Sequence, residues 1–108
     1  MAITINLRYK GQNGSALRFA EEMLSSGTVD MIRAEKGNLR YEYYRSLDDP
    51  ETILLIDSWR DQSAIDAHHA SPMMQTIAAL REKCDLHMTV ERCVSAEENA
   101  SDERFIRK

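Results

Sequence analysis

The chain has 108 residues, and its 14 lysines and arginines against 18 aspartates and glutamates give a formal charge of −4. One domain of this length buries roughly 65% of the surface of its unfolded chain, so we expect a single thin core. The basic residues are interleaved with acids, which excludes the clustered positive charge that nucleic-acid binding needs. No stretch approaches the roughly 18 apolar residues of a membrane span, and no secretion signal is visible. We therefore expect a cytoplasmic protein without membrane contacts.

The first 60 residues switch between a period of two and a helical period. Residues 2–9 alternate between apolar and polar side chains, which predicts a strand. Apolar residues then recur at helical spacing from residue 16 to about residue 34, with Gly37 as the predicted end; residues 25–28 weaken the middle of this helix and could loosen a turn there. Residues 38–47 and 53–59 again read as strands, and the turn at 48–51 joins them in a hairpin.

The residues after 60 predict a helical region followed by one more strand. Asp61 can cap a short helix, and Ser71-Pro72 begins a second helix that continues to about residue 84. Residues 85–94 alternate as a last strand, so the predicted order is β-α-β-β-α-β, an α+β ferredoxin-like domain with an antiparallel sheet. Its bounds are 1–94. Two helical segments cover only one sheet face, and a second copy of the chain is the simplest cover for the other.

The polar segment 95–108 ends in Phe105 and Ile106. These two apolar residues suggest an anchor that docks on the body or on a partner chain, and a frayed terminus is the alternative.

His68 and Asn6 are the polar residues that we expect in the interior. His68 lies on the apolar side of its short helix, where it is either a packed core histidine or a proton donor and acceptor in an apolar pocket. Asn6 is either satisfied by backbone groups or orients a carbonyl, a phenol or oxygen. His69 points about 100° away from His68 on a helix, so we expect no shared metal ion, and no phosphate-binding or covalent-catalysis motif is present.

Four segments resemble the antibiotic biosynthesis monooxygenase family. They are Glu35-Lys-Gly-Asn-Leu-Arg-Tyr41, Asp49-Pro50, Leu55-Ile-Asp-Ser-Trp59-Arg-Asp and Ala67-His-His-Ala-Ser-Pro72. The resemblance covers roughly residues 2–94 and is nearest to the quinol monooxygenase branch. Many relatives carry a His directly after Ser-Pro, where this chain has Met73. The haem-degrading branch shares Asn6 but has its pocket Trp at the position of His68.

The resemblance implies a homodimeric α/β barrel with an apolar pocket between helices and sheet, and oxidation by O2 without metal, flavin or other cofactor. The leading hypothesis is a monooxygenase acting on a small quinol or polyphenol, in which His68 removes a phenolic proton and Asn6 holds the oxyanion or O2. The predicted substrate-binding residues are Trp59, Tyr41, Tyr43, Met73, Met74, Ile77 and Arg8.

Two alternatives remain open from the sequence. One is isomerisation of a small carbonyl or phosphorylated sugar-like compound, with His68 as proton shuttle; an arginine such as Arg8 or Arg40 in the pocket would favour this reading. The other is a non-catalytic dimeric binding or stress-response module, which a pocket filled by its own side chains would favour.

Overall fold

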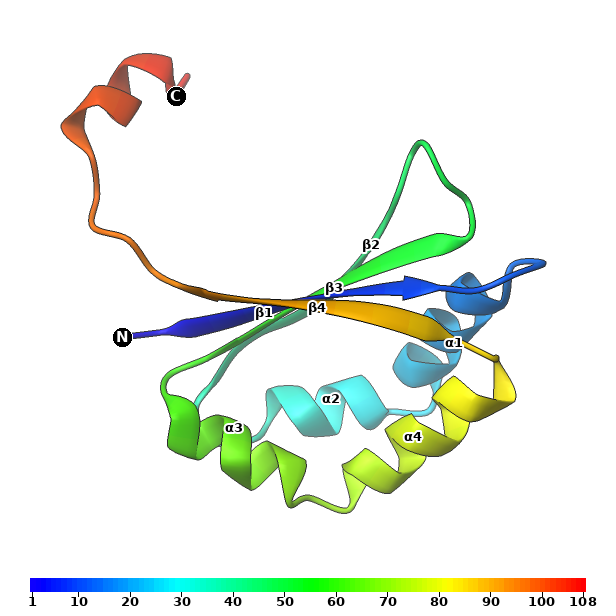
Figure 1. Ribbon diagram of the computed structural model, residues 1–108. Helices are drawn as coiled ribbons and strands as arrows, with labels where there is room; N and C mark the ends of the chain where they lie inside the picture. The colour runs from blue at the N-terminus through cyan, green and yellow to red at the C-terminus, as the bar shows by residue number, and fades with distance from the viewer.

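A four-stranded antiparallel sheet with four α-helices on one face forms the body of the protein (Figure 1). The computed structural model describes residues 1–108. The elements in chain order are β1 (Ile3–Lys10), α1 (Ser15–Ser25), α2 (Thr28–Arg33), β2 (Asn38–Arg45), β3 (Thr52–Trp59), α3 (Gln62–His69), α4 (Met73–Lys83), β4 (His87–Val94) and the 3-10 helix η1 (Ala100–Phe105). The strand order β2-β3-β1-β4 is the ferredoxin-like one, so the predicted fold class is confirmed.

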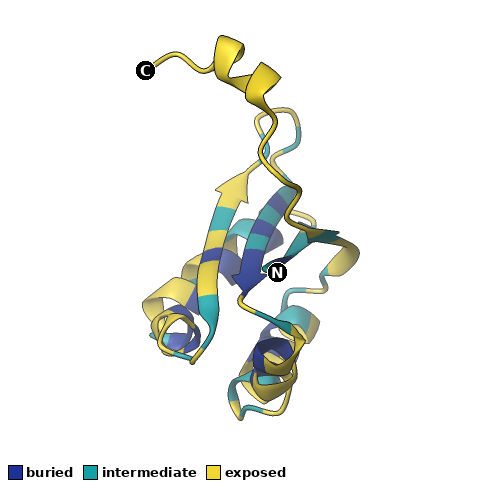
Figure 2. Ribbon diagram, turned by 90° about the vertical axis from the view of Figure 1, so that its left-hand side faces the viewer, coloured by how far each residue is buried: buried dark blue, intermediate teal, exposed yellow.

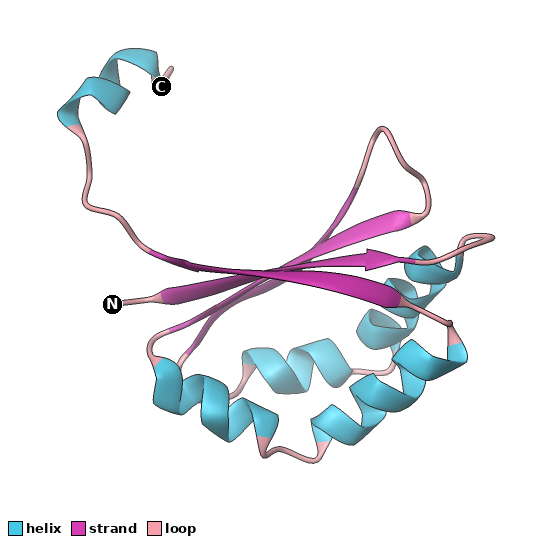
Figure 3. Cartoon of the chain, viewed as in Figure 1, coloured by secondary structure: helices cyan, strands magenta, loops and turns pink.

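The alternation in the strands decides which side chains face the helices. In β1 the odd-numbered residues from Ile3 to Tyr9 lie against the helices, and β3 contributes its odd-numbered residues from Ile53 to Trp59 in register with them. The even-numbered residues of both strands point to the opposite face, which no helix covers (Figure 3). The core therefore occupies a single layer between the sheet and the helices.

Two helices occupy residues 15–33 in place of the one predicted, and they separate within residues 25–28, where the sequence indicates a weakened turn. α1 ends at Ser25, and Gly27 has a φ of 81° in the left-handed region. Only glycine adopts this conformation without strain, so the chain turns here and α2 begins in a new direction. α2 packs against β2 and brings Glu35, just beyond its end, toward the helix layer.

The third and fourth helices are separated at Ser71-Pro72, as the sequence predicts. Asp61 caps α3 by accepting a hydrogen bond from the Ala64 amide at 3.0 Å. α4 starts at Met73 and packs against α1 and α3. The two short helices thus bend over the sheet rather than lying flat on it (Figure 3).

The uncovered face of the sheet is a mixture of apolar and paired polar side chains. Leu54 and Ile56 lie half-buried on the central strand β3. The Thr4 and Ser58 hydroxyls hydrogen-bond at 2.8 Å, and Asn6 donates to Glu91 at 3.1 Å. In a single chain, this face has no cover.

Residues 95–108 run away from the body and end in η1 (Figure 2). Phe105 is 80% exposed and Ile106 is 52% exposed. Docking of this segment on a second copy stays a prediction. No helix in the chain has the length and apolar character needed to cross a membrane.

Candidate functional site

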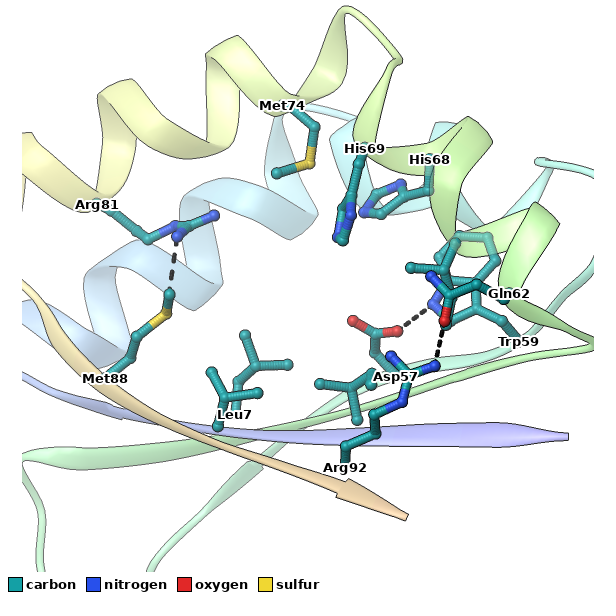
Figure 4. Close-up of a pocket in the computed structure, with 13 residues that line it drawn as sticks. Leu7, Asp57, Trp59, Gln62, His68, His69, Met74, Arg81, Met88 and Arg92 are labelled. Carbon is teal, nitrogen blue, oxygen red and sulfur yellow. Dashed lines mark hydrogen bonds between the residues drawn. The ribbon is translucent and has the colours of Figure 1, made fainter. Parts of the chain in front are cut away.

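A cavity of about 340 Å³ lies between the helix-facing side of the sheet and helices α3 and α4 (Figure 4). Ligand pockets in proteins typically measure about 300–1,000 Å³, so this cavity has room for a small molecule. A narrower extension of about 50 Å³ continues toward the core. The cavity is lined by Ile5, Leu7, Asp57, Trp59, Gln62, Ile65, His68, His69, Met74, Arg81, Met88, Val90 and Arg92.

His68 is held in the wall of the cavity by a carboxylate from a distant loop. It is 5% exposed, and its Nδ1 lies 2.9 Å from Oε1 of Glu35. Its ring packs on Trp59 with 4.7 Å between centroids and a 30° interplanar angle. A carboxylate accepts the Nδ1 proton, so Nε2 is the ring nitrogen left to accept a proton from a ligand. This is the arrangement of a general base with an orienting acid.

Asp57 places a second carboxyl group at the same end of the cavity. It lies on β3 with 8% of its surface exposed, and its Oδ1 accepts a hydrogen bond from the Trp59 indole N–H (Figure 4). Burial raises the pKa of Asp57 to about 6, because an ionised carboxylate loses its hydration there. The Trp59 hydrogen bond and the charge of His68 lower that pKa in part, while Glu35 raises it.

Tyr9 and Tyr41 line the inner extension, and Tyr43 packs behind them. Tyr41 also pairs across the sheet with Asp57, and its ring meets that of Tyr43 edge-on at 5.9 Å. Burial raises the pKa of Tyr9 to about 12 and also raises the pKa values of Tyr41 and Tyr43. All three phenols therefore stay neutral at physiological pH.

Two arginines line the cavity without an acidic partner. Arg92 on β4 donates to Gln62, and Arg81 on α4 has a single weak contact, from Nη1 to the Met88 sulfur at 3.6 Å. Figure 4 shows Arg81 across the cavity from Asp57 and Trp59. The cavity therefore has apolar side chains along its middle, with Asp57, the imidazoles and the Gln62-bonded Arg92 at one end and Arg81 at the other.

The structure brings five of the predicted site residues together. His68, Trp59 and Met74 line the cavity, and Tyr41 and Ile77 line its inner extension.

The other four predicted residues lie elsewhere. Tyr43 and Met73 pack against the core without lining the cavity. Asn6 and Arg8 lie on the uncovered face of the sheet, because they alternate with the cavity-lining residues Ile5 and Leu7. The structure therefore does not bring Asn6 to His68.

Sequence reasoning missed Glu35, Asp57 and Arg81. The position of Asp57 was predictable, because it lies two residues before Trp59 on the same strand and its side chain therefore faces the helices as well. Arg81 lies four residues after the buried Ile77 on one helix face, which also pointed inward. Glu35 lies in a loop, where no periodicity indicates its direction. No three His, Cys, Asp or Glu side chains are grouped so as to hold a metal ion.

The fold and its cavity define an α+β protein of the ferredoxin-like type with a pocket under its helices. A family model for antibiotic biosynthesis monooxygenases matches residues 2–80. The chain belongs to the antibiotic biosynthesis monooxygenase family.

Individual relatives agree with this assignment. The chain is 30% identical over 61 residues to "Putative monooxygenase YcnE" of Bacillus subtilis; the match covers 55% of this chain and 64% of that protein. The structure of SnoaB from Streptomyces nogalater, a cofactor-independent oxygenase, matches with a TM-score of 0.74 and 16% identity over 92% of this chain and 97% of its own. Rv0793 from Mycobacterium tuberculosis matches with a TM-score of 0.73 and 23% identity, over 93% of this chain and 100% of its own. These two structural matches show the shared fold.

Proposed function

We propose that the protein is a monooxygenase that oxidises a small quinol or polyphenol with O2, and that His68 is its general base. The contact between Glu35 and His68 carries the proposal, because a buried imidazole with a carboxylate on Nδ1 is prepared to accept a proton at Nε2. Family membership and the name of the YcnE relative support the oxygenase chemistry.

The proposed reaction begins with transfer of a phenolic proton to His68. The phenolate carries electron density to an ortho or para ring carbon that bears a hydrogen atom, and that carbon forms a bond to O2. The resulting ring hydroperoxide takes up a proton and then loses water, which leaves one oxygen atom as a carbonyl on the ring. One atom of O2 enters the product and the other leaves as water, so the electrons come from the substrate itself.

Two carboxyl groups support the charged form of His68 in this step. Glu35 contacts Nδ1, and Asp57 lies close enough that the charge of His68 lowers the pKa of Asp57. Because the surroundings are apolar, these charges act more strongly on the new imidazolium than they would in water. The protein thus contributes a base, its stabilisation and a cavity with apolar side chains around the substrate ring.

Oxygen uptake tests this proposal. We expect a naphthohydroquinone to be oxidised faster with the protein than without it, after subtraction of autoxidation. The His68→Gln variant should lose about 100-fold or more of the protein-dependent rate, while His87→Gln, which changes an exposed imidazole outside the cavity, should retain most of it. Equal rates for His68→Gln and the original protein would remove His68 from the mechanism.

We also propose that the working unit is a homodimer joined through the uncovered sheet face. Leu54 and Ile56 form a half-buried apolar centre on this face, and the flanking polar side chains already have hydrogen-bond partners within the chain. A face of this kind can be buried by a second copy without leaving those polar groups unpaired.

A further inference from the structure

Arg81 is a charged side chain in the cavity wall that nothing in the chain neutralises. Its Nε atom is buried without a hydrogen-bond partner, and it forms no ion pair with any carboxylate. Its one contact is the weak one to the Met88 sulfur. Buried charged groups normally have an acidic partner, because an unpaired charge in an apolar surrounding is costly.

The groups that face Arg81 do not supply that partner. Tyr9 and Tyr43 lie near enough for its positive charge to lower their pKa values, but burial keeps both phenols neutral. The one carboxyl group lining the cavity, Asp57, is bonded to Trp59 across the cavity from Arg81 and forms no ion pair with it. Arg92 is an exposed residue at the edge of the cavity and is bonded to Gln62. An anion that enters the cavity would therefore meet Arg81 unoccupied.

We propose that Arg81 binds the carboxylate of an aromatic acid, so that the substrate of the cavity is a hydroquinone that carries a carboxylate group. The proposal rests on the proposed oxidation at His68 and specifies its substrate class. A guanidinium matches a carboxylate with two parallel hydrogen bonds, and its single positive charge balances a single negative one. The apolar lining from Leu7, Met74 and Val90 suits the ring between the two ends.

This arrangement fixes the orientation of the substrate. With the carboxylate at Arg81, the ring lies along the apolar middle of the cavity and a hydroxyl group reaches the end that holds His68 (Figure 4). The reverse orientation would place the carboxylate beside Asp57, whose like charge repels it, and beside Arg92, which is exposed to solvent and already bonded to Gln62. Arg81 is therefore a specificity-determining residue rather than one that reacts.

The binding experiment uses Trp59 as its probe. Trp59 is the only tryptophan of the chain and lines the cavity, so quenching of its fluorescence reports occupancy. The two ligands are 2,5-dihydroxybenzoate and its neutral amide, 2,5-dihydroxybenzamide, titrated without oxygen so that no turnover occurs. We expect the acid to bind about 10- to 100-fold more tightly than the amide, as a charge-assisted bidentate contact implies.

Three variants test whether Arg81 causes the tighter binding of the acid. Arg81→Gln should bring the two dissociation constants to near equality by weakening the acid alone, and Arg81→Lys should retain part of the preference. Lys83→Gln removes an exposed cation from the same helix and should leave the preference unchanged. A merely structural role of Arg81 would weaken both ligands alike. The proposal is overturned if the acid gives no saturable quenching, if it binds no better than the amide, or if its advantage survives in Arg81→Gln.

The binding experiment tests the carboxylate site separately from the proposed oxidation. Preference for the acid without any protein-dependent oxygen uptake would support the carboxylate site and reject the monooxygenase proposal. Oxygen uptake with equal binding of acid and amide would do the reverse.

Discussion

Oε1 of Glu35 lies 2.9 Å from Nδ1 of His68, although the two residues are 33 positions apart in the chain. Glu35 follows α2 and His68 lies near the end of α3, so the contact joins the two halves of the helix layer. Both side chains are largely buried, with 16% of Glu35 and 6% of His68 exposed. Their pairing fixes the imidazole through Nδ1 and leaves Nε2 as the ring nitrogen that can accept a proton.

Replacing Glu35 by Gln keeps an oxygen that can accept from Nδ1 but removes the negative charge. The imidazolium formed during proton transfer then loses its nearest stabilising partner, so we expect kcat for oxygen uptake to fall about 10- to 100-fold with little change in KM. Glu82→Gln, at an exposed position of α4, is the matched control and should behave like the original protein. An unchanged kcat in Glu35→Gln would show that the carboxylate has no part in the chemistry.

Gly37 controls how closely the Glu35 loop approaches α3. A Cβ at this position would lie 2.6 Å from Cβ of Ala64, and φ is +88°. Gly27 has a similar φ of +81° but open space around it, so Gly27→Ala measures backbone strain alone. We expect Gly37→Ala to lower the free energy of unfolding by about 1–3 kcal/mol more than Gly27→Ala, as the steric overlap adds to the strain. Urea unfolding of both variants gives the difference, and equal losses would contradict a close approach here.

Asp57 makes stability depend on pH in a specific window. Its pKa is about 6 in the folded protein against 3.8 for the free side chain, so the folded state binds the proton more tightly than the unfolded chain. The free energy of unfolding contributed by this group is therefore greatest below about pH 4 and falls as the pH rises to about 6, by about 3 kcal/mol at most.

Asp57→Asn should remove this fall. We expect the variant to gain stability relative to the original protein as the pH rises from 4 to 6, measured by urea unfolding across that range. Asp48→Asn, an exposed change of the same kind, should give a difference that does not follow this curve. A difference between Asp57→Asn and the original protein that is constant with pH would contradict the raised pKa.

The uncovered sheet face is the part of the molecule that the dimer proposal depends on. Ile56→Lys places a charge at its centre, and we expect light scattering to show a change from the mass of two chains to that of one. Met31→Lys, on the exposed surface of α2, is the control and should stay dimeric. A single-chain mass for the unmodified protein would reject the dimer.

The strands were predictable because a period of two reports directly on a sheet with one covered face. The same alternation puts Trp59 on the helix-facing side of the sheet. In β1 it puts Ile5 and Leu7 on that side and Asn6 on the opposite one. The prediction of an interior Asn6 is wrong because Ile5 and Leu7 occupy the covered face and Asn6 alternates with them.

The acid partner of His68 could not be predicted in the same way. Glu35 reaches His68 only because Gly27 ends one helix and starts another, and because Gly37 lets the following loop lie close to Ala64. Both features depend on glycines with positive φ, and their effect on the position of Glu35 is seen only in the folded chain. The lack of a partner for Arg81 is equally invisible in the sequence, since it depends on where every carboxylate of the fold lies.

The most direct test of the account is the fate of 18O2 during oxidation of a naphthohydroquinone by the original protein and by His68→Gln, with the product trapped by reduction and analysed by mass spectrometry. We predict one 18O atom in each product molecule, formed about 100-fold or more slowly by His68→Gln. A product without 18O, or equal incorporation by the two proteins, would contradict a monooxygenase that works through His68.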